Sequence, residues 1–167
     1  SAPTQISLSS TDSFTVQSTA ATTSGYSFGG WSNGTNTYQA NATYNMTTSN
    51  VTLTAIWNVA APGTPGTPTV SAGDGNATIT VVAPSSGGAP TSYTVTASPG
   101  GATCTVISPA TSCTITGLTN GTSYSFSTVA NNATGSSSGS ASSASVSPAG
   151  KPGVPTGVTA TIGNGSA

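Results

Sequence analysis

Few residues of this 167-residue sequence could do chemistry. The charged side chains are Asp12, Asp74 and Lys151, and the sequence holds no Glu, Arg or His. General acid–base catalysis needs paired carboxylates or an imidazole, and zinc or calcium sites need several such ligands. A single Lys cannot neutralise a row of phosphates. The sequence therefore predicts a protein that is not an enzyme, binds no cofactor or metal, and has no nucleic acid partner.

The three charged residues themselves lie in turn-like or linker sequences. Asp12 in STDS and Asp74 in AGDG are typical of turns, where Asp hydrogen-bonds its own backbone. Lys151 is the only candidate donor for an intramolecular isopeptide bond, but its sequence AGKPG is a Gly/Pro-rich linker without a buried acid to assist. We assign no site to any of the three.

The only two cysteines, Cys104 and Cys113, offer the clearest covalent feature. They fall on adjacent predicted strands joined by a turn that contains Pro109, where Cβ atoms come within bonding reach. Two buried thiols or a redox pair are the alternatives, but the spacing is not C-x-x-C and no charged neighbour lowers a thiol pKa. The sequence favours a structural disulfide, which predicts an oxidising, extracellular compartment.

Asparagine is the other residue type with a pattern. Eight of the eleven asparagines head an N-x-S/T sequon. These candidate glycosylation sites are Asn33, Asn41, Asn45, Asn50, Asn76, Asn120, Asn132 and Asn164. They fall mainly at predicted turns, where glycans would be exposed. The alternative is that Asn and Thr are simply turn and strand residues.

The elements that position these residues are expected to be strands. Ser and Thr make up 62 of the 167 residues and Gly another 21, which favours strands, turns and linkers over helices. VTLTAIW at 51–57 alternates with period two and should be half buried. Tyr26, Phe28, Trp31 and Tyr44 are expected in a core, since few other large side chains could fill one. No stretch approaches 18 consecutive apolar residues, so no membrane insertion is expected.

The first third of the chain carries a resemblance. GYSFGGWSNGTNTYQANATYNMTTSNVTLTAIW resembles the internalin-type B repeat, also called the Listeria–Bacteroides repeat. This resemblance implies a β-grasp-like domain over residues 1–58, with at most a little helix. Members usually begin with a further strand that this chain is expected to lack. VAAPGTPGT at 59–67 follows as a Pro/Gly linker.

The next segment, residues 68–148, predicts an immunoglobulin-like β-sandwich. Strands are expected around 68–72, 76–83, 91–98, 102–107, 112–116, 122–130 and 140–147. Their inward residues are expected to be Ile79 and Val81, Tyr93, Val95 and Ala97, and Tyr124, Phe126 and Thr128. PGTPTV, TSYTVTA and GLTNGTSY resemble a fibronectin type III domain, although the usual core Trp of the second strand is absent. The fold class is therefore all-β, as two tandem small domains.

Residues 149–167 are expected to form a linker and the first strand of a further unit. Val158, Ala160 and Ile162 alternate on one face, and the tail followed by residues 1–8 resembles a complete B-repeat opening. One hypothesis is that the tail donates a strand to the next copy's N-terminal domain and builds a filament. The other is that the chain is a fragment of a linear array of surface modules.

These expectations favour a structural role outside the cell. The leading interpretation is a stalk or filament subunit of a cell-surface or adhesin assembly, secreted or surface-bound, whose partners are neighbouring copies of itself or adjacent modules. One alternative is a module that binds surface glycans or proteins through an exposed platform at Trp31, Tyr38 or turn residues. Another is an accessory part of a secreted glycan-degrading enzyme. An exposed aromatic patch would favour binding.

Overall fold

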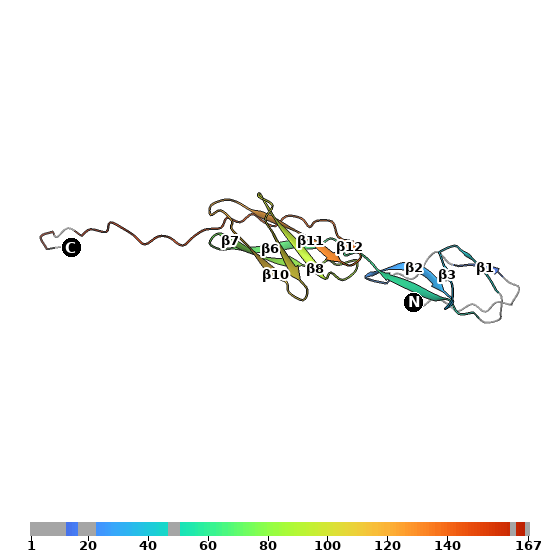
Figure 1. Ribbon diagram of the computed structural model, residues 1–167. Coiled ribbons are helices and arrows are strands. Elements are labelled where there is room, and N and C mark those ends of the chain that lie inside the picture. The colour runs from blue at the N-terminus through green and yellow to red at the C-terminus, as the bar shows by residue number, and fades with distance from the viewer. Residues whose placement is uncertain (1–12, 17–22, 47–50, 161–162, 166–167) are drawn as a thin grey trace.

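The fold is described from a computed structural model, which covers residues 13–16, 23–46, 51–160 and 163–165 (Figure 1). These residues form twelve strands and no helix. The predicted all-β class is confirmed. In Figure 1 the first domain lies at one end, a sandwich lies in the middle, and the C-terminal segment extends from the far end of the sandwich.

The first domain contains two small antiparallel sheets. β1 (Ser13–Thr15) pairs with β4 (Thr43–Asn45), and the second sheet has the order β3-β2-β5. Its strands are β2 (Tyr26–Ser32), β3 (Thr37–Tyr38) and β5 (Thr54–Val59). β2 and β5 therefore provide most of the surface on which the core of this domain forms.

A bulge in β2 explains how two aromatic residues three positions apart share one face. Phe28 is opposite Trp57, and Trp31 is opposite Ala55, so three steps along β2 match two steps along β5. The register shifts between Phe28 and Gly30, and Gly30 has a φ of 124°, which favours glycine. The two glycines of GYSFGGW thus place Phe28 and Trp31 on the same side of the sheet.

The core of the first domain is small and aromatic. Its buried members are Val16, Trp31, Tyr44 and Met46. Tyr38 packs edge-on against Tyr44 with ring centroids 4.9 Å apart. The prediction of a buried Tyr26 is wrong, since this side chain is 48% exposed. Tyr26 is opposite Val59 at the end of the β2–β5 pair, beyond the area that the core covers.

The second domain is a sandwich of two antiparallel sheets. One sheet has the order β10-β7-β6 and the other β12-β11-β8-β9. The strands are β6 (Gly66–Ala72), β7 (Asn76–Val82), β8 (Ser92–Ser98), β9 (Thr103–Ile107), β10 (Ser112–Thr116), β11 (Ser125–Asn132) and β12 (Gly135–Ser136). β6 begins earlier than the expected residue 68.

Alternation along the strands places the core of the sandwich. All the residues expected to point inward on 76–83, 91–98 and 122–130 are buried, from Ile79 to Thr128. Burial raises the pKa of the Tyr93 phenol above its ordinary value, because the ionised form would lose hydration. The backbone N–H of Thr119 donates to the Tyr124 hydroxyl at 3.1 Å, which is the arrangement of a tyrosine corner.

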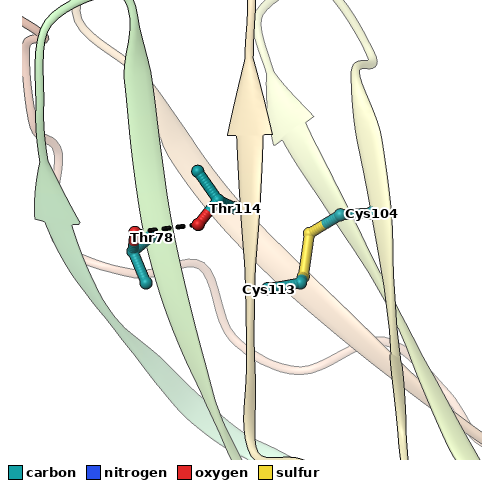
Figure 2. The surroundings of a disulfide bond; sticks show 4 residues. All are labelled: Thr78, Cys104, Cys113 and Thr114. Atoms are coloured by element: carbon teal, nitrogen blue, oxygen red, sulfur yellow. Dashed lines mark hydrogen bonds between the residues drawn. A yellow bond between two sulfur atoms is a disulfide. The ribbon is translucent and has the colours of Figure 1, made fainter.

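The disulfide between Cys104 and Cys113 links the two sheets of the sandwich (Figure 2). The expectation that the two cysteine strands are paired neighbours in one sheet is wrong, because β9 pairs with β8 and β10 pairs with β7. On the other side of β10, Thr114 hydrogen-bonds Thr78 of β7 at 3.0 Å. The disulfide therefore closes one edge of the sandwich, where two edge strands from different sheets meet.

The expected strand at 140–147 is replaced by a row of serines with period three. We call Ser137, Ser140 and Ser143 the serine row. Each of these residues donates its N–H to a β11 carbonyl at 2.9 Å. Its hydroxyl oxygen accepts the N–H of the same β11 residue at 2.9–3.1 Å. Each step of three residues between the serines thus matches a step of two residues along β11, so an ordinary ladder with alternating faces cannot form.

Replacing Ser143 by alanine should lower the free energy of unfolding by about 1–3 kcal/mol. The Phe126 N–H donates to the Ser143 hydroxyl in the interior, and a buried donor without an acceptor costs about this much. Urea unfolding measures the change. Ser142→Ala is the matched control, because Ser142 is exposed and should change stability by at most about 0.5 kcal/mol. Equal effects of the two substitutions would contradict the role of the serine row.

Candidate functional site: the interdomain joint

The linker backbone between the domains is held by the turn that joins β11 to β12. Asn132 Nδ2 donates to the Ala60 carbonyl at 2.8 Å, and Thr134 Oγ1 donates to the Val59 carbonyl at 2.9 Å. The Asn132 carboxamide oxygen also accepts the N–H groups of Thr134 and Gly135 within the same turn. One asparagine therefore both shapes the turn and binds the linker.

The loop between β7 and β8 holds the next linker residues. The Gly88 N–H donates to the Ala61 carbonyl at 3.0 Å, and the Gly63 N–H donates to the Ser86 carbonyl at 2.9 Å. A side chain at Gly88 would have no room, because its Cβ would collide with the Ala60 carbonyl oxygen. Close backbone approach of this kind is what glycine permits.

The first domain also contacts the linker between the domains. β5 ends at Val59, so its sheet runs directly into the linker, and the Ala60 N–H donates to the Gly25 carbonyl at 3.0 Å. A Cβ at Gly25 would lie 3.3 Å from the Gly87 carbonyl oxygen. We call residues 59–61 together with Gly88, Asn132 and Thr134 the interdomain joint.

The Pro/Gly linker predicted at 59–67 hydrogen-bonds the second domain. The carbonyls of residues 59, 60 and 61 all accept hydrogen bonds from that domain. The pair of adjacent glycines in PSSGGAP, at 84–90, is a sequence signal for such a close backbone contact. The contact partners lie 72 and 75 residues away in the sequence.

Two sequon asparagines form the same kind of turn. The Asn33 carboxamide oxygen accepts the N–H groups of Thr35 and Asn36 at 3.0 and 2.7 Å, as the Asn132 oxygen does two and three residues ahead. The Asn in an Asn-x-Thr sequence suits this turn because its oxygen accepts N–H groups ahead in the chain. These contacts give a structural reason for two of the sequons.

Two further sequon asparagines gather at the opposite end of the sandwich. Asn120 Nδ2 donates to Asp74 Oδ1 at 2.8 Å, and its oxygen accepts the Gly75 N–H at 2.8 Å. Asn76 Nδ2 donates to the Asp74 carbonyl at 2.8 Å. The Asp74 carboxylate thus accepts a hydrogen bond from a distant loop.

The remaining predicted site residues lie outside both the interdomain joint and the contact between Asp74 and Asn120. Asn41, Asn45 and Asn164 are exposed. Lys151, Val158 and Ala160 lie in an exposed segment that forms no strand. Asp12, Asn50 and Ile162 lie outside the described residues. Four of the sequon asparagines therefore hydrogen-bond backbone groups. The charged residues within the described part of the chain do not form one site.

The chemistry available in the described part of the chain is hydrogen bonding, mostly between neutral groups. Within these residues no three His, Cys, Asp or Glu side chains gather where they could hold a metal ion. Nor does the same part of the chain contain a helix with the length and apolar composition to cross a membrane. The interdomain joint is therefore the candidate functional site, and what it can do is fix the orientation of two domains.

Comparison with protein families gives two matches along the chain. Residues 63–146 match the fibronectin type III domain, and residues 7–61 match the divergent InlB B-repeat domain. Domains of both kinds are typical of extracellular or surface proteins and are typically non-catalytic. No protein with curated annotation matches the chain.

Solved structures are also similar to parts of this chain. Domains A168–A170 of titin are 19% identical with a TM-score of 0.51, over 75% of this chain and 55% of that one. The chicken CNTN1 FN1–FN3 domains are 20% identical with a TM-score of 0.48, over 55% and 34%. The twitchin kinase region from C. elegans is 28% identical with a TM-score of 0.45, over 53% and 17%. The chain spans less than two thirds of each of these structures, and the titin likeness concerns the fold alone.

Proposed function

Because this chain belongs to the fibronectin type III family and carries a divergent InlB B-repeat domain ahead of that domain, we propose that it is a structural module of an extracellular or cell-surface assembly. Its role is that of a stiff spacer in a stalk or filament. Its partners are neighbouring copies of itself or adjacent modules. It performs no catalysis of its own.

The interdomain joint is the observation that carries this proposal. A spacer needs a defined angle between its domains, and a flexible linker would lose it. Here Asn132, Thr134 and Gly88 of the second domain bind three successive linker carbonyls, while the Ala60 N–H binds the first domain. The linker is thus held from both sides, which supports a stiff unit rather than two domains on a tether.

The covalent and electrostatic features support the same role. Disulfides persist in oxidising compartments, and Cys104–Cys113 stabilises a sandwich that lacks a tryptophan in its core. Three charged residues in 167 leave hydroxyl and amide groups to hydrate the surface. Contacts between neutral surfaces avoid the cost of desolvating charges, which suits close packing of modules.

One observation favours the alternative of a glycan- or protein-binding module. Tyr26 is 48% exposed and Val59, its cross-strand partner, is 49% exposed. They form a small apolar patch beside the interdomain joint. Trp31, which the binding alternative placed on a platform, is only 6% exposed and belongs to the core. The patch is therefore limited to two side chains, and the structural role remains the better supported one.

Residual dipolar couplings of the isotope-labelled protein test the proposal. If the interdomain joint is stiff, the amides of β2 and β5 and those of the sandwich strands should fit one common alignment tensor. Small-angle scattering should give an extended particle of fixed length. Separate tensors for the two domains, with a broad distribution of scattering lengths, would remove the basis for a stiff spacer.

A further inference from the structure

The segment that follows the sandwich is rich in Gly and Pro, but its last residues, 157–160, alternate as a strand does and have no partner strand among the described residues. Every residue of 150–160 is exposed, and Val154 and Val158 are each 87% exposed. Val158 and Ala160 flank Thr159, so small apolar side chains share one face if this stretch is extended. β-branched residues with period two fit a pleated, half-buried surface.

This segment leaves the sandwich at the end opposite the interdomain joint. The Ala149 N–H donates to the Gly73 carbonyl at 3.1 Å, and the Gly121 N–H donates to the Pro148 carbonyl at 2.9 Å. Figure 1 shows the chain running from there away from the first domain. The nine steps from Ala149 to Val158 span at most about 32 Å. Residues 150–160 form no strand in this structure, so Val158 is not paired with β5 of its own chain.

Most sheet edges of the described molecule are protected against pairing with another strand. Pro68 and a bulge interrupt β6, the disulfide joins the edge strands β9 and β10, and the serine row covers β11. β1 and β4 have three residues each, and β3 has two. Proline, bulges and short length are common ways to block edge-to-edge association.

β5 has none of these protections. It has six residues, TAIWNV, without proline or charge, and in the described residues it pairs only with β2. The core-facing side here is also incompletely covered, because Ala55 of β5 and Leu53 just before it pack against the buried cluster yet remain partly exposed. A strand added beside β5 would satisfy backbone groups that no other described strand pairs, and it would cover these side chains.

We propose that residues 157–160 of one copy pair with the free edge of β5 in a second copy of this chain. Val158 and Ala160 would then face the side that carries Leu53 and Ala55. This contact rests on the proposed structural function, and it names the surface through which one copy would bind the next. Donor and acceptor lie at opposite ends of the molecule, so the contact is head-to-tail and builds an open chain of copies.

Light scattering after size-exclusion chromatography tests this pairing on the full chain, refolded from urea with the disulfide intact so that strand addition can occur during folding. The wild-type chain should form concentration-dependent linear oligomers. Val158→Asp should weaken association by about a hundredfold, since a carboxylate would be buried without a partner. Val154→Asp is the matched control, because Val154 has the same exposure but precedes Pro155, which has no N–H to pair. It should associate like the wild type.

A labelled peptide with the sequence of residues 154–163 locates the acceptor. It should bind the Val158→Asp chain and protect β5 amides from hydrogen exchange, while the same peptide with Asp at position 158 should not bind. Equal association of wild type and Val158→Asp, absence of both oligomers and peptide binding, or protection at another strand would each overturn the proposal. The alignment of the two domains is a separate measurement, so a negative result for strand pairing would not contradict the spacer function.

Discussion

Replacing both Cys104 and Cys113 by serine should lower the free energy of unfolding of the second domain by about 2–3 kcal/mol. The disulfide closes a loop with a sequence separation of 9, and the loop-entropy relation gives this magnitude for about ten residues. The total free energy of unfolding of a small domain is about 5–15 kcal/mol. The effect is therefore a substantial fraction of the stability of a domain whose core lacks tryptophan.

Urea unfolding followed by circular dichroism measures this loss. With the m-value of a small domain, the midpoint should fall by about 1–2 M urea. Reducing agent provides the control, because it should destabilise the wild type to a similar extent and leave the double-serine variant unchanged. An unchanged midpoint would mean that the sandwich edge is held by the contacts around Thr78 and Thr114 and not by the covalent bond.

Replacing Gly88 by alanine should uncouple the two domains. The new Cβ would meet the Ala60 carbonyl oxygen, a backbone atom that cannot rotate away, and would also lie 2.9 Å from Asn132 Nδ2. The linker must then move, and the hydrogen bonds to the Ala60 and Ala61 carbonyls are lost. Each contributes about 0.5–1.5 kcal/mol, so the preference for one orientation should largely disappear.

Residual dipolar couplings measure this uncoupling directly. The Gly88→Ala chain should need separate alignment tensors for its two domains, while the buried strands of the sandwich keep their chemical shifts. Gly139→Ala is the matched control, because a Cβ there would meet no atom within 4 Å. If the Gly88→Ala chain still fits one tensor, the orientation of the domains does not depend on the interdomain joint.

Local patterns in the sequence predicted much of the sandwich. Period-two alternation identified the inward residues of β7, β8 and β11, because burial on one face of a strand leaves a signal within a few residues. The same reasoning failed at 140–147, where the serine row advances three residues for every two of β11. The expectation for Tyr26 failed for another reason, since the scarcity of large side chains does not tell where the core ends.

Much less of the candidate site could be predicted from local sequence. An Asn-x-Thr sequence is compatible with a glycan and with a turn, and only the structure shows which N–H groups the oxygens of Asn33 and Asn132 accept. Asn132 and Thr134 reach carbonyls more than 70 residues away. No local pattern encodes which distant backbone such a turn will meet.

The amino-acid sequence by itself determined an all-β chain with almost no charge and two cysteines, because composition and alternation act through local backbone preferences and burial. Only the tertiary structure decided which sheets the disulfide joins, and that the linker is held at the interdomain joint. Those features arise from contacts between segments far apart in the chain, and such contacts follow from the packing of whole domains.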